Sequence, residues 1–332
     1  MKKSTRRTFL KQGAATVGVL TAASVLSEIV PAQASGDARG ISTSSEKAKV
    51  YFTKDISPES MLKLYKLVNQ SITGKVAVKI HTGQPIAPYI LSTDMVKAVT
   101  DSIPGCTIVE TNMFNPGNPR EKTESHKKVI AANGWTFTPI DILDEDGSVY
   151  LPVPGGKWFK EIAMGSHIKN YDSVVVLTHF KGHPIGGFGG SLKNIAIGFA
   201  SGAEGKKQMH QRGEDIYGVV GEQFMEHMAE SGKAIIEYFG PRITYVNVLN
   251  NMSVDCDCVG GDAEPPTVPD LGIMASTDIL AIDQASIDMV YALPKEVNKH
   301  LVERIESRKG LHQLTAMERL GMGNRNYEII NV

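Results

Sequence analysis

Short apolar runs alternate along this sequence with segments of helical periodicity, and this alternation limits the fold more than any other feature. The strongest run is 173–178, which is rich in valine. Runs of this kind indicate strands that are covered on both faces. Parallel strands need crossovers, which helices supply, so the pattern predicts an α/β fold with a mostly parallel central sheet flanked by helices. The other predicted strands are 76–80, 107–110, 244–248 and 271–275.

Helical segments fill the intervals between these strands. Residues 58–72 carry apolar side chains at helical spacing and follow Ser57, a residue type that caps helix N-termini. The other predicted helices are 93–103, 124–133, 191–200, 222–239, 278–293 and 297–308. No boundary in composition follows residue 48, so residues 48–332 are expected to form one domain.

The first 34 residues have the pattern of an export signal. Positive charges precede an uncharged stretch at 13–26, and Ala32-Gln33-Ala34 suits a small-x-small cleavage site. The pair Arg6-Arg7 within residues 5–11 matches the twin-arginine type of signal. The alternatives are an ordinary secretory signal and an uncleaved anchor.

Such a signal implies export of the folded protein, to the periplasm or the cell exterior, and makes the twin-arginine export machinery a partner. Proteins that use this route often acquire a cofactor first, so the signal favours a cofactor. Residues 35–47 are small and polar and are expected to form a linker. No other run reaches the roughly 20 apolar residues that a transmembrane helix needs, so no span is expected in the mature form.

Charge and cysteine content exclude several classes of function. Lys and Arg total 35 against 36 Asp and Glu, so there is no basic excess for nucleic acid. Three cysteines can neither build a disulfide framework nor supply the four thiolates of an ordinary iron–sulfur cluster within one chain.

The densest group of reactive side chains follows the strand predicted at 173–178. His179, Lys181 and His183 come directly after it, and Lys193 and Asn194 open the next predicted helix. Ligands in open α/β sheets bind beyond the carboxyl ends of the strands. A glycine-rich loop here lets the backbone approach a ligand and leads to a helix N-terminus, which favours an anion. Its glycines are Gly186, Gly187, Gly189 and Gly190. The alternative is a flexible loop with incidental histidines.

Cys256 and Cys258 form a second group, after the strand predicted at 244–248. Cysteines this close rarely bridge each other because the ring would be strained. Both can bind a soft metal such as iron, nickel or zinc, with histidine as the commonest further ligand. The alternatives are thiols that are free or paired elsewhere, or a disulfide to Cys106. Cys106 itself is expected to be a buried thiol without a role in the site.

A third group lies at the end of the strand predicted at 76–80. Lys79 and His81 share a face of that strand, so they are candidates for the same site. His210 and His312 are weaker candidates. Asp283 lies early in an apolar helix and needs a partner if it is buried.

In their order and spacing these motifs resemble the DUF362 family, whose members are often labelled uncharacterised iron–sulfur centre proteins. The resemblance covers about residues 48–325. Many members carry a ferredoxin-like insertion with repeated Cys-x-x-Cys, whereas residues 211–242 here contain no cysteine. The cluster that those members bind therefore cannot be carried over to this chain, and the resemblance implies a site more readily than a substrate. The segments that carry it are 79–81, 179–194, 255–258, 269–276, 281–285 and 310–313.

We interpret the chain as an exported metal- or cofactor-binding protein, a redox enzyme acting on a small anionic substrate. The expected metal ligands are Cys256, Cys258, His179 and His81, with His183 as an alternative to either histidine. The expected catalytic residues are Lys193, His183 and Asp257, with Asp283 as an alternative to Asp257. The expected anion- or cofactor-binding residues are Lys79, Lys181, Gly187, Gly189, Gly190 and Asn194. The alternatives are a non-catalytic carrier of a metal or small anion, and an electron-transfer subunit that works with a redox partner or a second copy.

Overall fold

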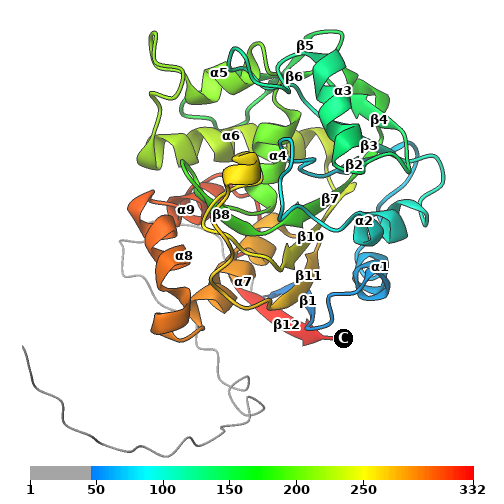
Figure 1. Ribbon diagram of the computed structural model, residues 1–332, viewed down its shortest axis with the longest axis vertical. Helices are drawn as coiled ribbons and strands as arrows, with labels where there is room; N and C mark the ends of the chain where they lie inside the picture. Colours follow the sequence, from blue (N-terminus) through cyan, green and yellow to red (C-terminus); the bar gives the residue numbers. More distant parts are fainter. Residues whose placement is uncertain (1–45) are drawn as a thin grey trace, which may run out of the picture. The chain divides into compact units, whose positions relative to one another are not determined.

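An eight-stranded sheet forms the centre of the computed structural model, which describes residues 46–332 (Figure 1). Its strand order is β12-β1-β11-β10-β7-β2-β3-β4. Strand β11 pairs antiparallel with β1 and with β10, and every other neighbouring pair is parallel. The prediction of a mostly parallel sheet flanked by helices is confirmed. The predicted signal, and the linker up to residue 45, lie outside the described residues.

The elements have the following bounds. The strands of the large sheet are β1 Ala48–Thr53, β2 Val76–Lys79, β3 Thr107–Glu110, β4 Ile140–Ile142, β7 Ser173–His179, β10 Ile243–Leu249, β11 Gly272–Ser276 and β12 Tyr327–Asn331. Two small hairpins add β5 Ser148–Pro152 with β6 Glu161–Gly165, and β8 Lys181–His183 with β9 Gly187–Gly189. The helices are α1 Pro58–Lys66, α2 Thr93–Thr100, α3 Thr123–Ala132, α4 Ser191–Phe199, α5 Gly205–His210, α6 Gly221–Phe239, α7 Ile279–Tyr291, α8 Lys295–Ser307 and α9 His312–Arg319, with 3-10 turns at Ser166–Asn170 and Gly260–Asp262.

Strand β7 shows why the central strands read as continuous apolar runs. All seven of its residues are buried. Val174 and Val176 pack in the core that includes α4 and α7, while Val175 and Leu177 pack on the other face with α1 and α2. Successive side chains of a strand point to opposite faces, so a strand covered by helices on both sides is apolar throughout.

The helix boundaries follow local chemistry. Ser57 caps α1 as expected, since its hydroxyl accepts a hydrogen bond from the amide of Ser60 at 3.2 Å. Asp278 caps α7 in the same way through Ala281. Helix α1 ends at Lys66, earlier than the apolar periodicity predicted. No helix among residues 46–332 is long and apolar enough to cross a membrane.

The glycine-rich segment after β7 forms a β-hairpin, whereas the sequence predicted a loop. Strands β8 and β9 pair antiparallel from Lys181 opposite Gly189 to His183 opposite Gly187. Gly187 has φ +77°, and a side chain there would collide with Gly310. Gln313 donates hydrogen bonds to the carbonyls of Gly186 and Phe188 at 2.8 and 3.1 Å. The segment from Gly310 to Gln313 thereby fixes the hairpin.

Candidate functional site

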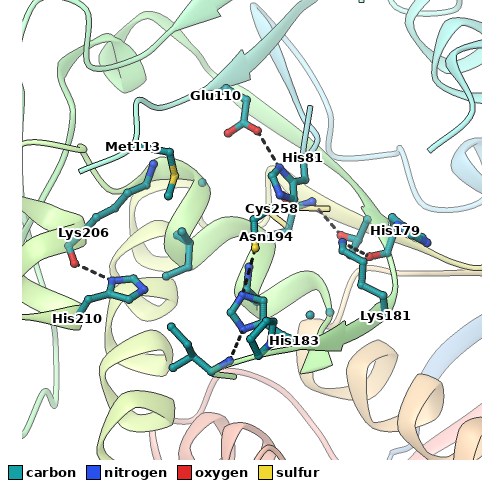
Figure 2. Close-up of a pocket in the computed structure, with 18 of the residues that line it drawn as sticks. His81, Glu110, Met113, His179, Lys181, His183, Asn194, Lys206, His210 and Cys258 are labelled. Atoms are coloured by element: carbon teal, nitrogen blue, oxygen red, sulfur yellow. Dashed lines mark hydrogen bonds and ion pairs between the residues drawn. The ribbon is translucent and has the colours of Figure 1, made fainter. Parts of the chain in front are cut away.

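The carboxyl ends of four adjacent parallel strands meet at one edge of the sheet. Strands β3, β2 and β7 end at Glu110, Lys79 and His179, and the cysteine-containing loop follows β10. A cavity of about 160 Å³ opens at this edge (Figure 2). The position is the one expected for a ligand site in an open α/β sheet.

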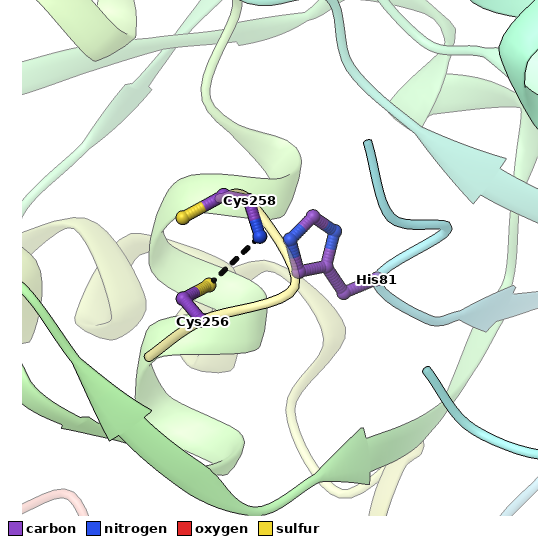
Figure 3. Close-up of side chains that lie close together, drawn as sticks. All are labelled: His81, Cys256 and Cys258. Carbon is purple, nitrogen blue, oxygen red and sulfur yellow. Dashed lines mark hydrogen bonds between the residues drawn. The ribbon is translucent and has the colours of Figure 1, made fainter. Parts of the chain in front are cut away.

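Cys256, Cys258 and His81 come together at this edge (Figure 3). One donor atom from each residue lies within 4.8 Å of the other two. His81 and Cys258 line the cavity, while Cys256 is buried beside it. Both cysteines are free, as is Cys106, which is buried in the core that contains α1 and α2. The disulfide alternatives are therefore not formed.

The two thiols differ in their readiness to ionise. Burial opposes ionisation of Cys256, but a hydrogen bond from Cys258 and the positive charge of Lys193 outweigh it and hold the pKa of Cys256 well below its usual value. The Lys193 Nζ lies 3.9 Å from the Cys256 sulfur. The same hydrogen bond, together with burial, raises the pKa of Cys258. Cys256 is thus the thiolate of the pair, and thiolates are the form that binds metals.

Glu110 orients His81. The His81 Nδ1 lies 3.4 Å from a Glu110 oxygen, and the amide of Thr82 donates to that same oxygen at 3.0 Å. Burial disfavours the charged carboxyl, but Lys79 at 3.2 Å and His81 reverse this and hold the pKa of Glu110 well below its usual range. A carboxylate on one imidazole nitrogen leaves the other free to bind a metal.

His183 has the opposite hydrogen-bond arrangement to His81. Its Nδ1 accepts from the backbone amides of Ile185 and Gly186, at 3.2 and 2.8 Å. Burial, reinforced by Lys193, lowers the pKa of His183 to about 4, so the ring is neutral near pH 7. Its hydrogen is therefore on Nε2, which lies 3.8 Å from the Cys258 sulfur. A nitrogen that carries hydrogen cannot bind a metal, so this geometry favours a hydrogen-bond donor.

His179 and Lys181 are both held by Asp257, which lies between the two cysteines. The carboxylate of Asp257 is 3.1 Å from the His179 Nδ1 and 2.9 Å from the Lys181 Nζ. The His179 Nε2 faces the carbonyl of Asn250 at 2.8 Å. Both ring nitrogens thus have acceptor partners, and the structure places His81 rather than His179 with the thiols. Burial opposes ionisation of Asp257, but Lys181 and His179 hold its pKa at about 2.

The N-terminus of α4 already holds an anion from the protein itself. The amides of Ser191 and Leu192 donate to the carboxylate of Asp283 at 2.8 and 2.9 Å. A side chain at Gly190 would meet that carboxylate at 2.5 Å. The sequence predicted these amides for an external anion, and the structure gives them to Asp283. Gly189 and Gly190 do line the cavity. Asn194 also lines it, but its amide nitrogen donates to the Leu177 carbonyl and the Thr178 hydroxyl, both at 3.0 Å.

Sequence reasoning missed several residues of the cavity. Glu110 ends a predicted strand just as Lys79 does, so its position was a signal that could have identified it. Arg120 comes from the loop after β3, and Lys206 comes from α5 together with His210, which the sequence offered as a weaker candidate. Nothing local marks Arg120 and Lys206, because only the tertiary fold brings them here. His312 lies 3.2 Å from Glu226, and neither residue lines the cavity.

The sequence matches the model of DUF362, a domain of unknown function, over residues 76–288. The protein belongs to the DUF362 family. All residues described above at the strand ends fall inside the matched region, whereas Gln313, which anchors the β8–β9 hairpin, lies beyond it. No curated protein matches the sequence.

Two solved structures show distant likeness to this DUF362 protein. The lactate racemase apoprotein from Thermoanaerobacterium thermosaccharolyticum aligns over 74% of this chain and 57% of its own, with 12% identity and a TM-score of 0.42. A structural-genomics target from Thermotoga maritima aligns over 59% and 51%, with 14% identity and a TM-score of 0.36. The chain thus spans little more than half the length of either protein.

Proposed function

We propose that this protein is a metal-dependent enzyme that acts on a small anion. One observation carries the proposal: two thiols and an imidazole converge at the wall of a cavity lined by lysines and an arginine. Structural metal sites close their shell with four protein ligands, whereas catalytic sites keep a position open for substrate. Three ligands beside a cationic cavity fit the second description.

The donor set fits iron, nickel or zinc. Around a tetrahedral metal with bonds of about 2.0–2.3 Å, donor atoms lie roughly 3.5–3.8 Å apart. The three donors here lie within 4.8 Å of one another, so small side-chain shifts complete the shell. Bound there, a metal would supply Lewis acidity, and iron or nickel would add electron transfer, which is the redox role expected from the sequence.

The surrounding side chains have distinct proposed roles. Lys193, beside Cys256, offers a positive charge to an anion in the cavity. His183 keeps a hydrogen on Nε2 and donates a hydrogen bond from it to the substrate. Asp257 is a positioning residue, because it ties the cysteine loop to β7 and β8 through His179 and Lys181. The export and location expected from residues 1–34 stand as further proposals.

Metal analysis of anaerobically purified protein tests the centre. We expect about one equivalent of iron, nickel or zinc in the wild type and none in a Cys256→Ser/Cys258→Ser double variant. Cys106→Ser, which changes a buried thiol elsewhere, is the matched control and keeps the metal. A double variant that is fully loaded would contradict the proposal.

A histidine pair sharpens the test. His81→Asn is expected to lose about 10- to 100-fold or more in metal affinity, while His179→Asn keeps most of it, because of these two histidines only His81 lies with the thiols. The carrier alternative is separated by turnover: an enzyme converts a bound small carboxylate, followed by NMR of the mixture, and a carrier releases it unchanged.

A further inference from the structure

Arg120 is a buried cation whose side chain has no hydrogen-bond partner among residues 46–332. Its side chain is 3% exposed and lines the cavity. Its Nη1 lies 3.9 Å from a Glu110 oxygen, within an ion pair but beyond hydrogen-bond reach, and its Nε is buried without a partner. A buried guanidinium without hydrogen-bond acceptors is costly, so this position calls for a ligand that supplies acceptors.

The other buried cations of the cavity are already engaged. Lys79 contacts Glu110 and the Ile80 carbonyl. Lys181 contacts Asp257 and the His179 carbonyl. The ammonium of Lys206 donates to the Thr111 hydroxyl at 2.9 Å and to the carbonyls of Thr111 and Asn112. Arg120 is therefore the buried cation of the lining whose donors remain free for a ligand.

The loop that carries Arg120 is fixed before any ligand arrives. The Arg120 carbonyl accepts from the Met113 amide at 2.8 Å, and its own amide donates to the Asn118 side chain at 2.9 Å. The guanidinium is thereby presented to the cavity without a cost of ordering the backbone, which is what favours tight binding of a small ligand.

The charge of the cavity favours an anion whether or not a metal is bound. Five cations line it, against the carboxylates of Glu110 and of Asp257, which contacts Lys181. Asp144, which attracts Lys206, reduces the excess further, and burial lowers the pKa of Lys206 to about 7, so between one and two positive charges remain near pH 7. A divalent metal and two thiolates cancel each other, so the bound centre does not change this balance, whereas the Cys256 thiolate of the metal-free protein lowers it by one charge.

The rest of the cavity wall is apolar, and the cavity is small. Phe114 lies 5.0 Å from the His210 ring and 5.2 Å from the Tyr217 ring, and all three line the cavity with Met113 and Ile197. A bare inorganic oxyanion leaves such a wall without contacts. A cavity of about 150 Å³ holds a molecule the size of benzene, which has about six heavy atoms. The cavity described here, at about 160 Å³, therefore suits a ligand of similar size.

We propose that the cavity binds a small organic monocarboxylate, whose carboxylate is held by the Arg120 guanidinium and whose apolar body lies against Phe114 and Tyr217. Arg120 presents a planar fork that matches a carboxylate in bidentate fashion. The inference rests on the proposed function in that this ligand is the substrate of that site. Arg120 is its specificity-determining residue.

Calorimetric titration of the unaltered protein with three probes tests the ligand class. Isobutyrate, isobutyramide and inorganic phosphate separate charge from shape, and none requires a variant to fold. We expect isobutyrate to bind at least about 10-fold more tightly than the uncharged amide, because a hydrogen-bonded charge is lost, and more tightly than phosphate, which cannot use the apolar wall. Phosphate binding as tightly as isobutyrate, or amide binding equal to acid, overturns the proposal.

Substitutions of Arg120 then test whether this residue holds the carboxylate of the ligand. Arg120→Gln is expected to weaken isobutyrate binding about 10- to 100-fold, and Arg120→Lys, which keeps the charge but not the fork, by less. Arg308→Gln, an exposed arginine of the chain, leaves affinity unchanged. Circular dichroism shows whether each variant is folded. If Arg120→Gln does not fold, Arg120→Lys is used to test the assignment. Unchanged affinity in a folded Arg120 variant overturns the assignment.

The readouts keep this inference separate from the metal centre. Arg120→Gln is expected to retain the metal content of the wild type while it loses carboxylate affinity. Loss of metal in the cysteine double variant with retained isobutyrate binding supports both proposals. Protein that holds no metal yet binds isobutyrate through Arg120 sinks the metal centre alone.

Discussion

Asp257 and Asp283 are both buried aspartates, yet their surroundings shift the pKa of the two carboxyl groups in opposite directions. Asp257, in the cysteine loop, contacts Lys181 and His179, which outweigh burial and hold its pKa at about 2. Asp283 has only neutral donors, the amides of Ser191 and Leu192 and the side chain of Asn247. Burial therefore raises the pKa of Asp283 to about 6.

The difference separates a site from a structural anchor. Asp283 serves the fold, because it caps α4 from α7 and joins the two helices. Asp257 belongs to a cluster in which cations outnumber carboxylates, an arrangement with no structural necessity. Burial of a charged group alone therefore does not mark a functional residue, whereas an unbalanced set of buried charges at the strand ends does.

Removing the Asp257 carboxylate is expected to have the largest effect on stability. Asp257→Ala leaves Lys181 and His179 buried without their counter-ion, which costs about 3–5 kcal/mol in the free energy of unfolding. Urea denaturation of metal-free wild type and variant measures the difference, since bound metal would add its own stabilisation. A loss below about 1 kcal/mol would show that the cluster is not a buried charge network.

Acidification is expected to stabilise the folded wild-type protein relative to a variant whose side chain at position 283 cannot titrate. Its folded pKa of about 6 exceeds the unfolded value of about 3.9, so the folded protein binds more protons between these values and gains stability as pH falls through that window. Relative to Asp283→Asn, the wild type should gain about 2 kcal/mol from pH 7 to pH 4.5. Parallel urea titrations at the two pH values give this number. If the stability difference between wild type and Asp283→Asn became smaller on acidification, the pKa of Asp283 would be lowered rather than raised by folding.

At pH 7 the same Asp283→Asn change is expected to have the smallest effect. The amide keeps one acceptor for the α4 N-terminus and relieves the buried charge, so the loss is about 1 kcal/mol in the free energy of unfolding. Asp262→Asn, at an exposed position, is the matched control and should not differ from wild type. A cost equal to that of Asp257→Ala would remove the distinction between the two aspartates.

The sequence predicted the central strands well and the strands toward the β12 side of the sheet poorly. Residues 173–178 are buried on both faces, so composition alone identifies them. Strand β1 and strand β12 are only partly buried and lack that signal. The antiparallel direction of β11 is also absent from the sequence, because a buried apolar run looks the same in either direction.

The candidate site was predictable where residues follow a strand directly. Lys79, His81, His179 and Lys181 were all expected at one edge, and they lie there. Arg120 and Lys206 were not, since their approach depends on how a loop and a short helix fold over the sheet. Likewise, the pairing of Asp283 with the α4 N-terminus joins segments that are far apart in sequence, which no local pattern encodes.

The position of β1 has a consequence for the order of folding. Both of its neighbours, β11 and β12, come from the C-terminal part of the chain. During synthesis β1 therefore waits without a partner until residues 272–331 have left the ribosome, and contacts of such long sequence separation form slowly. Gln313 likewise fixes the β8–β9 hairpin only after the hairpin itself has been made. A nascent chain that stops before these segments lacks both closures, so the site assembles only after they have been synthesised.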